Sequence, residues 1–185
     1  NQELWNVIMN DLGKLDSIDN VPIKYLMNLY EVLFSIKVEK SYVNIDNLTK
    51  FIDKLDEIWE NNHTLVDSRF KGVIHSIIEE ECYKLEHNTR ASLYRVDYMH
   101  AGKNVVLVLG NESYVADRKK FLGHIELRKR LLTKLGFNLH VISKKEYLEK
   151  KKVQPKMQYV KDILKGIPRD QKKWKEIRDM KVSTQ

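Results

Sequence analysis

The chain has 185 residues, of which 42% are hydrophobic, and a formal net charge of +7. This length suffices for one large or two small domains with their own core, and the apolar and aromatic content excludes a disordered chain. The single cysteine excludes an internal disulfide framework. No apolar run approaches the roughly 18 to 20 residues needed to span a bilayer, and neither a secretory signal nor an Arg-rich transit peptide is visible after Asn1.

The charge is divided unevenly along the chain. Residues 1–89 hold 9 Lys and Arg against 16 Asp and Glu, a net charge of −7, whereas residues 90–185 hold 24 against 10, a net charge of +14. The second half is therefore expected to meet a polyanion, with nucleic acid ahead of anionic lipid. The acidic half is not expected to be the main phosphate-binding surface.

The acidic half is predicted to be helical. Apolar residues recur at helical spacing in four segments, which are residues 3–12, 22–36, 45–61 and a fourth from Asp67 or Ser68 to Leu85. Their even spacing and short joints are typical of stacked helix hairpins, as found both in α-solenoid repeats and in generic bundles. We interpret residues 1–89 as a helical repeat-like region.

Metal ligands show no recognised spacing. His75 and Cys82 share a helix face in the predicted fourth helix, but no C-x-x-C, H-E-x-x-H or H-x₃-H pair occurs. Neither a metal site nor a cofactor is expected.

The basic half is predicted to be a small α/β domain over residues 90–166, followed by a basic tail over residues 167–185. Residues 92–101 alternate as in a half-exposed strand, and the aliphatic run 105–109 resembles a buried strand that ends at Gly110. A basic helix over 121–135, a strand over 137–143 and a helix over 156–164 complete a ββαβ core.

Arg128 is the exception on the basic helix. Its position falls within the apolar face, near Leu135 and Phe121 on a helical wheel. Such an arginine either extends to the edge of the core or pairs with a buried acid. Asp97, on a neighbouring strand, is the expected partner.

These segments resemble the RAP domain, a small domain of apicomplexan and organellar proteins. The resemblance covers about residues 93–165. It is carried by Val-Asp-Tyr at 96–98, LRKRLLTKLGF at 127–137 with the strand after it, and QYVKDIL at 158–164.

The resemblance implies a restriction-endonuclease-like, PD-(D/E)XK fold that follows helical repeats in proteins binding organellar RNA. The expected fold class is thus a two-part α+β chain, with a helical repeat or bundle before a RAP-like domain. The resemblance also implies a mitochondrial location, and a part in RNA processing, RNA stability or the ribosome.

The sequence departs from this pattern where a nuclease would hold its metal ion. Such an enzyme needs one Asp on a strand and a second acid with a Lys on the next strand. Asp97 fits the first position, but the following strand carries no acid, and Glu112 comes only after Gly110. The inward Arg128 would also oppose a cation. No catalytic residue is therefore expected, and Asp97 is interpreted as vestigial.

The function expected from these features is RNA binding without catalysis, as an rRNA-binding component of a mitochondrial ribosome. Neighbouring proteins would bind the acidic helices, and no membrane partner is expected. The alternatives are an organellar RNA-processing or stability factor, including a metal-dependent endonuclease, and a protein-only scaffold. The predicted phosphate-binding residues are Lys119, Lys120, Arg130, Lys134, Lys144, Lys145, Lys150, Lys151, Lys152, Lys172 and Lys173.

Overall fold

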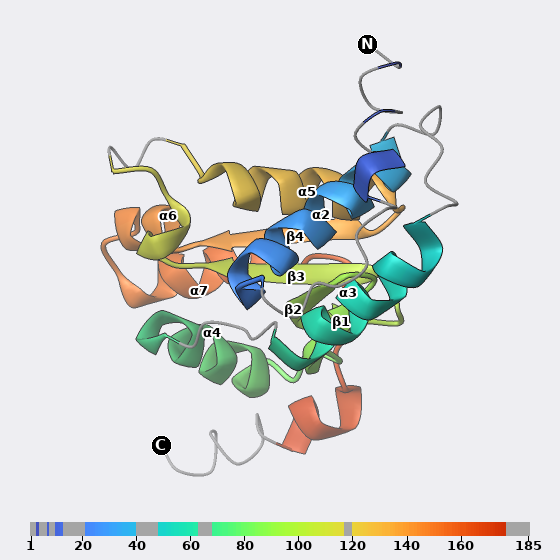
Figure 1. Ribbon diagram of the computed structural model, residues 1–185. Coiled ribbons are helices and arrows are strands. Elements are labelled where there is room, and N and C mark those ends of the chain that lie inside the picture. Colours follow the sequence, from blue (N-terminus) through green and yellow to red (C-terminus); the bar gives the residue numbers. More distant parts are fainter. Residues whose placement is uncertain are drawn as a thin grey trace. The chain divides into compact units, whose positions relative to one another are not determined.

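The chain folds into two compact units, Asn1–Thr64 and Leu65–Gln185. The computed structural model describes residues 3, 7, 10–12, 21–39, 48–62, 68–116 and 120–176 (Figure 1). No helix in these ranges combines the length and apolarity that crossing a membrane requires.

The first unit contains two helices that pack on each other, α2 (Ile23–Glu39) and α3 (Thr49–Asn62). Tyr30 lies at their contact: its hydroxyl donates to Asp56 Oδ1 at 2.6 Å, and its ring centroid is 5.6 Å from that of Trp59. Both helices were predicted. The predicted helix over 3–12 is described only at residues 3, 7 and 10–12, which are helical; its other residues lie outside the described ranges.

The second unit is built on a four-stranded mixed sheet. Its strands are β1 (Glu86–Ala91), β2 (Tyr94–His100), β3 (Asn104–Leu109) and β4 (Asn138–Ser143). They lie in the order β1-β2-β3-β4, with antiparallel pairs except β3 and β4, which are parallel. A parallel pair needs a crossover connection, and α5 (Gly123–Lys134) supplies it. The ββαβ core predicted from the sequence is present, with β1 added at one edge.

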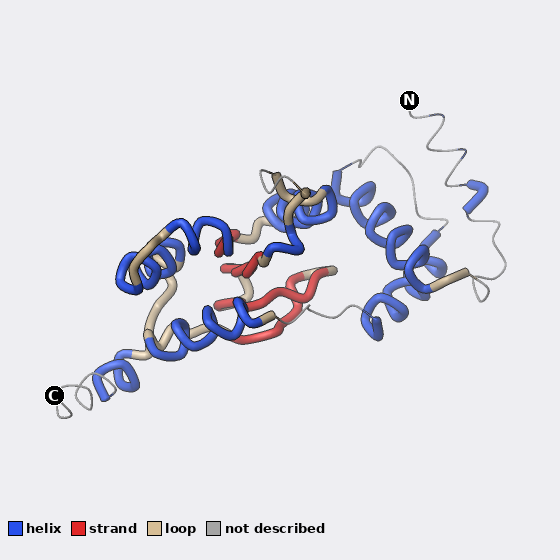
Figure 2. The backbone as a smooth tube through the Cα atoms, turned by 90° about the vertical axis from the view of Figure 1, so that its left-hand side faces the viewer, coloured by secondary structure: helices blue, strands red, loops and turns tan. Residues whose placement is uncertain are grey.

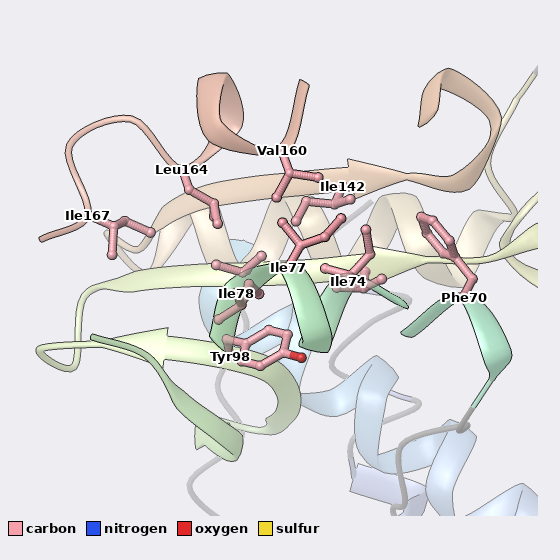
Figure 3. Packing of buried hydrophobic residues seen from close by; sticks show 11 residues of the cluster. Phe70, Ile74, Ile77, Ile78, Tyr98, Ile142, Val160, Leu164 and Ile167 are labelled. Carbon is pink, nitrogen blue, oxygen red and sulfur yellow. The ribbon is translucent and has the colours of Figure 1, made fainter. Parts of the chain in front are cut away.

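Helices cover both faces of this sheet (Figure 2). On one face, α4 (Arg69–Glu80) and α7 (Val153–Ile163) close over β2, β3 and β4, and Figure 3 shows their side chains meeting there. Alternate β3 residues point to the opposite face, and α5 packs against β4 outside that cluster. The cluster consists of Phe70, Ile74, Ile77, Ile78, Tyr98, Val106, Val108, Ile142, Val160, Leu164 and Ile167.

The domain boundary predicted between residues 89 and 90 differs from the observed division at Thr64 and Leu65. The predicted fourth helix ends at Glu80, and residues 86–91 form strand β1 instead. The apolar stripe of α4 packs on the sheet, so this helix belongs to the second unit. The sequence of β1, EHNTRA, is polar because this edge strand is mostly exposed, and it therefore carries no alternating signal.

The predicted tail also begins later than residue 167. Ile167 is buried in the core cluster, the Lys84 amide donates to the Pro168 carbonyl at 2.9 Å, and the Asp170 amide donates to the Cys82 carbonyl at 2.8 Å. The Arg169 guanidinium reaches Glu81 at 3.2 Å. Residues 167–170 are thus fixed to the second unit. Residues 171–176 are helical, and the rest of the predicted tail lies outside the described residues.

The position of α4 predicts the effect of two neighbouring substitutions. Ile74 is fully buried and Val73 is 41% exposed. Ile74→Ala is expected to lower the free energy of unfolding by about 2–5 kcal/mol, and the matched variant Val73→Ala by less than about 0.5 kcal/mol. Urea denaturation of both variants measures this difference. Equal losses would contradict the packing of α4 on the sheet.

Candidate nucleic-acid interface

Asp97 joins three elements of the second unit. Strands β2 and β3 pair from Tyr98 opposite Val106 to His100 opposite Asn104. Two residues further along β3, the Val108 amide donates to Asp97 Oδ2 at 2.8 Å, while Lys71 Nζ of α4 lies 2.7 Å from Oδ1. The Asp97 residue is 3% exposed. Both carboxylate oxygens therefore serve the fold, one through a charged and one through a neutral donor.

The predicted pair of Asp97 and Arg128 is wrong. Arg128 stacks over the Tyr94 ring, with its guanidinium carbon 5.3 Å from the ring centroid, and donates through Nη2 to the Arg95 carbonyl. The physical reason is that Asp97 pairs with Lys71 instead. Lys71 lies in α4, a helix that the sequence analysis assigned to the other domain. Lys71 lies outside the segments that carried the resemblance, so no motif pointed to it.

A polar network closes the sheet where the parallel strands β3 and β4 end. Ser143 Oγ lies 2.5 Å from Tyr114 Oη and accepts from the Glu146 amide at 3.3 Å, which caps helix α6 (Lys144–Glu149). Tyr159 Oη accepts from the Ser143 amide at 3.0 Å and donates to Glu146 Oε2 at 3.1 Å. Burial raises the pKa of both tyrosines above the usual value. The phenols therefore remain neutral at physiological pH.

Six of the predicted lysines gather around this network. Lys144 and Lys145 open α6, and residues 150–152 form the turn from α6 to α7. Lys120 belongs to the same region through its neighbours in the chain. Its carbonyl accepts from the Val115 amide at 2.9 Å, and the next residue, Phe121, forms a β-bridge with Tyr114. The Tyr114 hydroxyl in turn contacts Ser143 Oγ. All are exposed except Lys144, which is half-buried. We call this set the strand-end surface; it comprises Lys120, Lys144, Lys145, Lys150, Lys151 and Lys152.

The other predicted residues lie elsewhere. Because α5 begins near the end of β3 and leads back to the start of β4, its last residue, Lys134, lies at the opposite end of the sheet, and the exposed Arg130 lies one turn before it. Lys172 and Lys173 follow Asp170, and Lys173 Nζ pairs with Glu79 at 3.3 Å. Lys119 lies outside the described residues. The predicted set is thus not one continuous surface.

The loop after β3 carries Glu112, the first acidic residue after that strand. Glu112 folds back over Gly110: a Cβ at that glycine would lie 2.3 Å from Glu112 Oε2. Across the described ranges, no three His, Cys, Asp or Glu side chains gather in a way that suits a metal ion.

Removing Lys71 tests the role of Asp97 in the fold. Lys71→Met leaves a buried carboxylate without its cation, which is expected to lower the free energy of unfolding by about 3–5 kcal/mol. Lys71→Met/Asp97→Asn should recover most of that loss, because the amide oxygen still accepts from Val108. The control is Lys173→Met, whose ion pair with Glu79 is exposed and is expected to contribute at most about 1 kcal/mol. Chemical denaturation compares the three variants, and equal losses for the two lysines would contradict the assignment.

A comparison with protein families matches the segment that carries the strand-end surface. Residues 106–163, which run from within β3 to the end of α7 and contain the whole strand-end surface, match the family model of the RAP domain. No curated protein matches the chain. The predicted resemblance is confirmed over this range, and it indicates RNA binding in general. The second unit therefore includes a segment, residues 106–163, that matches the RAP domain family.

Proposed function

We propose that the protein binds RNA without cleaving it, as an rRNA-binding structural component of a mitochondrial ribosome. The observation that carries the RNA-binding part is the strand-end surface, whose six lysines project from the matched RAP segment. The proposed mitochondrial location and ribosomal role rest on the family resemblance and on the basic second half of the chain.

The strand-end surface suits phosphate groups more than bases. Lysines are point charges that neutralise phosphates without reading sequence. Each occupied lysine releases a counterion from the RNA, so affinity should fall steeply as salt rises. The binding we propose is thus strong at low salt and weakly specific.

The first unit is proposed to bind protein. Residues 1–64 hold 6 Lys and Arg against 11 Asp and Glu, a net charge of −5, whereas residues 65–185 hold 27 against 15, a net charge of +12. Electrostatic repulsion makes contact between this acidic unit and RNA phosphates unfavourable. We propose that its α2 and α3 are part of a helical repeat that contacts neighbouring proteins of the same ribonucleoprotein.

The absence of catalysis is proposed from the contacts of Asp97. We propose that the unit has the endonuclease-like fold, which places Asp97 where such an enzyme holds its cation. A divalent ion there would have to displace the Lys71 ammonium, 2.7 Å from Oδ1, and the Val108 amide, 2.8 Å from Oδ2. It would also lack a second carboxylate from the next strand, VVLVL. These contacts favour a structural Asp97.

The location is tested by fractionation. The tagged protein is expected to be found in mitochondria and to sediment with mitochondrial ribosomes. RNase treatment should release it or leave it on the disrupted subunit. Sedimentation apart from ribosomes with RNA still bound would favour the processing or stability factor. Recovery with proteins but without RNA would favour the scaffold.

Charge reversal tests the strand-end surface. Lys150→Glu/Lys151→Glu/Lys152→Glu is expected to weaken RNA binding by about tenfold or more and to flatten the dependence of log affinity on log salt by about 2–3. The control Lys24→Glu/Lys37→Glu/Lys50→Glu makes the same charge change at exposed lysines of the first unit and should lower affinity far less. Fluorescence anisotropy over a salt series measures both. Equal weakening would show that net charge, not this surface, governs binding.

Incubation of the protein with RNA and Mg²⁺ or Mn²⁺ tests catalysis. No cleavage above a protein-free control is expected, because Asp97 lacks a free oxygen and a second acid. Cleavage that disappears in Lys71→Met/Asp97→Asn, the variant expected to keep most of the stability, would establish the metal-dependent endonuclease instead. Cleavage unchanged in that variant would point to a contaminating enzyme.

A further inference from the structure

We infer that the strand-end surface binds unpaired RNA rather than duplex RNA, and that Leu148 and Val153 contact the bases. This inference rests on the proposed function and adds the class of RNA. It concerns two aliphatic side chains that phosphate binding does not explain.

Leu148 and Val153 stand on either side of the lysine turn. Leu148 in α6 is 55% exposed, and Val153, the first residue of α7, is 73% exposed. Only Lys150, Lys151 and Lys152 with Glu149 separate them in the chain. Single exposed aliphatic residues are common on protein surfaces. Two of them bracketing a run of three exposed lysines form a mixed apolar and cationic surface.

The exposure is built into a fixed backbone. Helix α6 is capped by Ser143 and tied to α7 by the bond from Tyr159 to Glu146. Its inward residue is Tyr147, whose ring centroid lies 5.4 Å from that of Phe70 in the core. Because adjacent helical residues point about 100° apart, Leu148 cannot turn inward while Tyr147 occupies the core side.

Unpaired RNA fits such a surface better than a duplex does. A duplex stacks its bases inside and offers phosphates and 2′-hydroxyls, which lysines bind but which leave Leu148 and Val153 without an apolar partner. An unpaired strand alternates phosphates with exposed base faces, on which apolar as well as aromatic side chains can pack. The nearby aromatic rings are already occupied: Tyr114 packs on Phe121 with centroids 4.6 Å apart, and Lys156 Nζ lies 5.2 Å from the Tyr147 centroid. The exposed aliphatic side chains therefore remain to meet the bases.

The experiment compares three probes with the full chain: a single-stranded RNA oligonucleotide, the duplex of the same sequence, and vesicles of phosphatidylserine and phosphatidylcholine. Leu148→Ser/Val153→Ser keeps every charge. It is expected to weaken single-strand binding by about tenfold, because apolar area of two side chains is no longer buried, and duplex binding by less than about twofold. The control is Val32→Ser/Val73→Ser, which changes two other exposed valines, 44% and 41% exposed, and should leave both affinities unchanged.

The outcomes separate the inference from the function on which it rests. Equal weakening of single-strand and duplex binding, or no weakening, would overturn the inference while RNA binding stands. Vesicle binding that the same double variant abolishes would assign the two side chains to an anionic membrane and overturn it as well. No binding of the wild-type chain to either RNA would overturn the proposed function together with the inference.

Discussion

The ion pair and hydrogen bond of the buried Asp97 carboxylate are the contacts on which the arrangement of α4, β2 and β3 depends. The carboxylate binds an ammonium from α4 at 2.7 Å and an amide of β3 at 2.8 Å, so one side chain joins a helix and two strands. Removing either partner would leave a polar group buried without a bond, which costs several kcal/mol. The same contacts decide the chemistry that we propose, because a carboxylate saturated by the fold is not available to a metal ion. We therefore propose that Asp97 holds α4, β2 and β3 together rather than a catalytic metal ion.

The surface that we propose for RNA binding lies elsewhere in the second unit, where strands β3 and β4 end. The parallel strands β3 and β4 end side by side, and the network around Ser143 fixes α6 there. The lysines that follow are presented by short, capped segments rather than by a long loop. If this surface binds RNA as we propose, its backbone loses little conformational entropy on binding.

Much of this arrangement was predictable from the sequence. The order of β2, β3, α5, β4 and α7 followed from apolar periodicity and from the LRKRLLTKLGF segment, and the RAP resemblance is confirmed over residues 106–163. Strand β1 was missed, because a polar edge strand lacks the alternation that marks a half-buried one. The partner of Asp97 was missed because periodicity shows that α4 has an apolar face but not which layer that face covers. The split of the predicted cations between the two ends of the sheet required the crossover direction of α5, which no local pattern contains.

Hydrogen exchange of the full chain, with and without saturating single-stranded RNA, distinguishes RNA bound at the strand-end surface from RNA bound near Asp97. We expect RNA to slow amide exchange in residues 120–122 and 143–156, the segments that carry the strand-end surface. Exchange in α2 and α3, and around Asp97 and Lys71, should change little. Protection centred on β2 and the start of α4, with the strand-end segments unchanged, would contradict this expectation, because the RNA would then lie over the carboxylate that we assign to the fold.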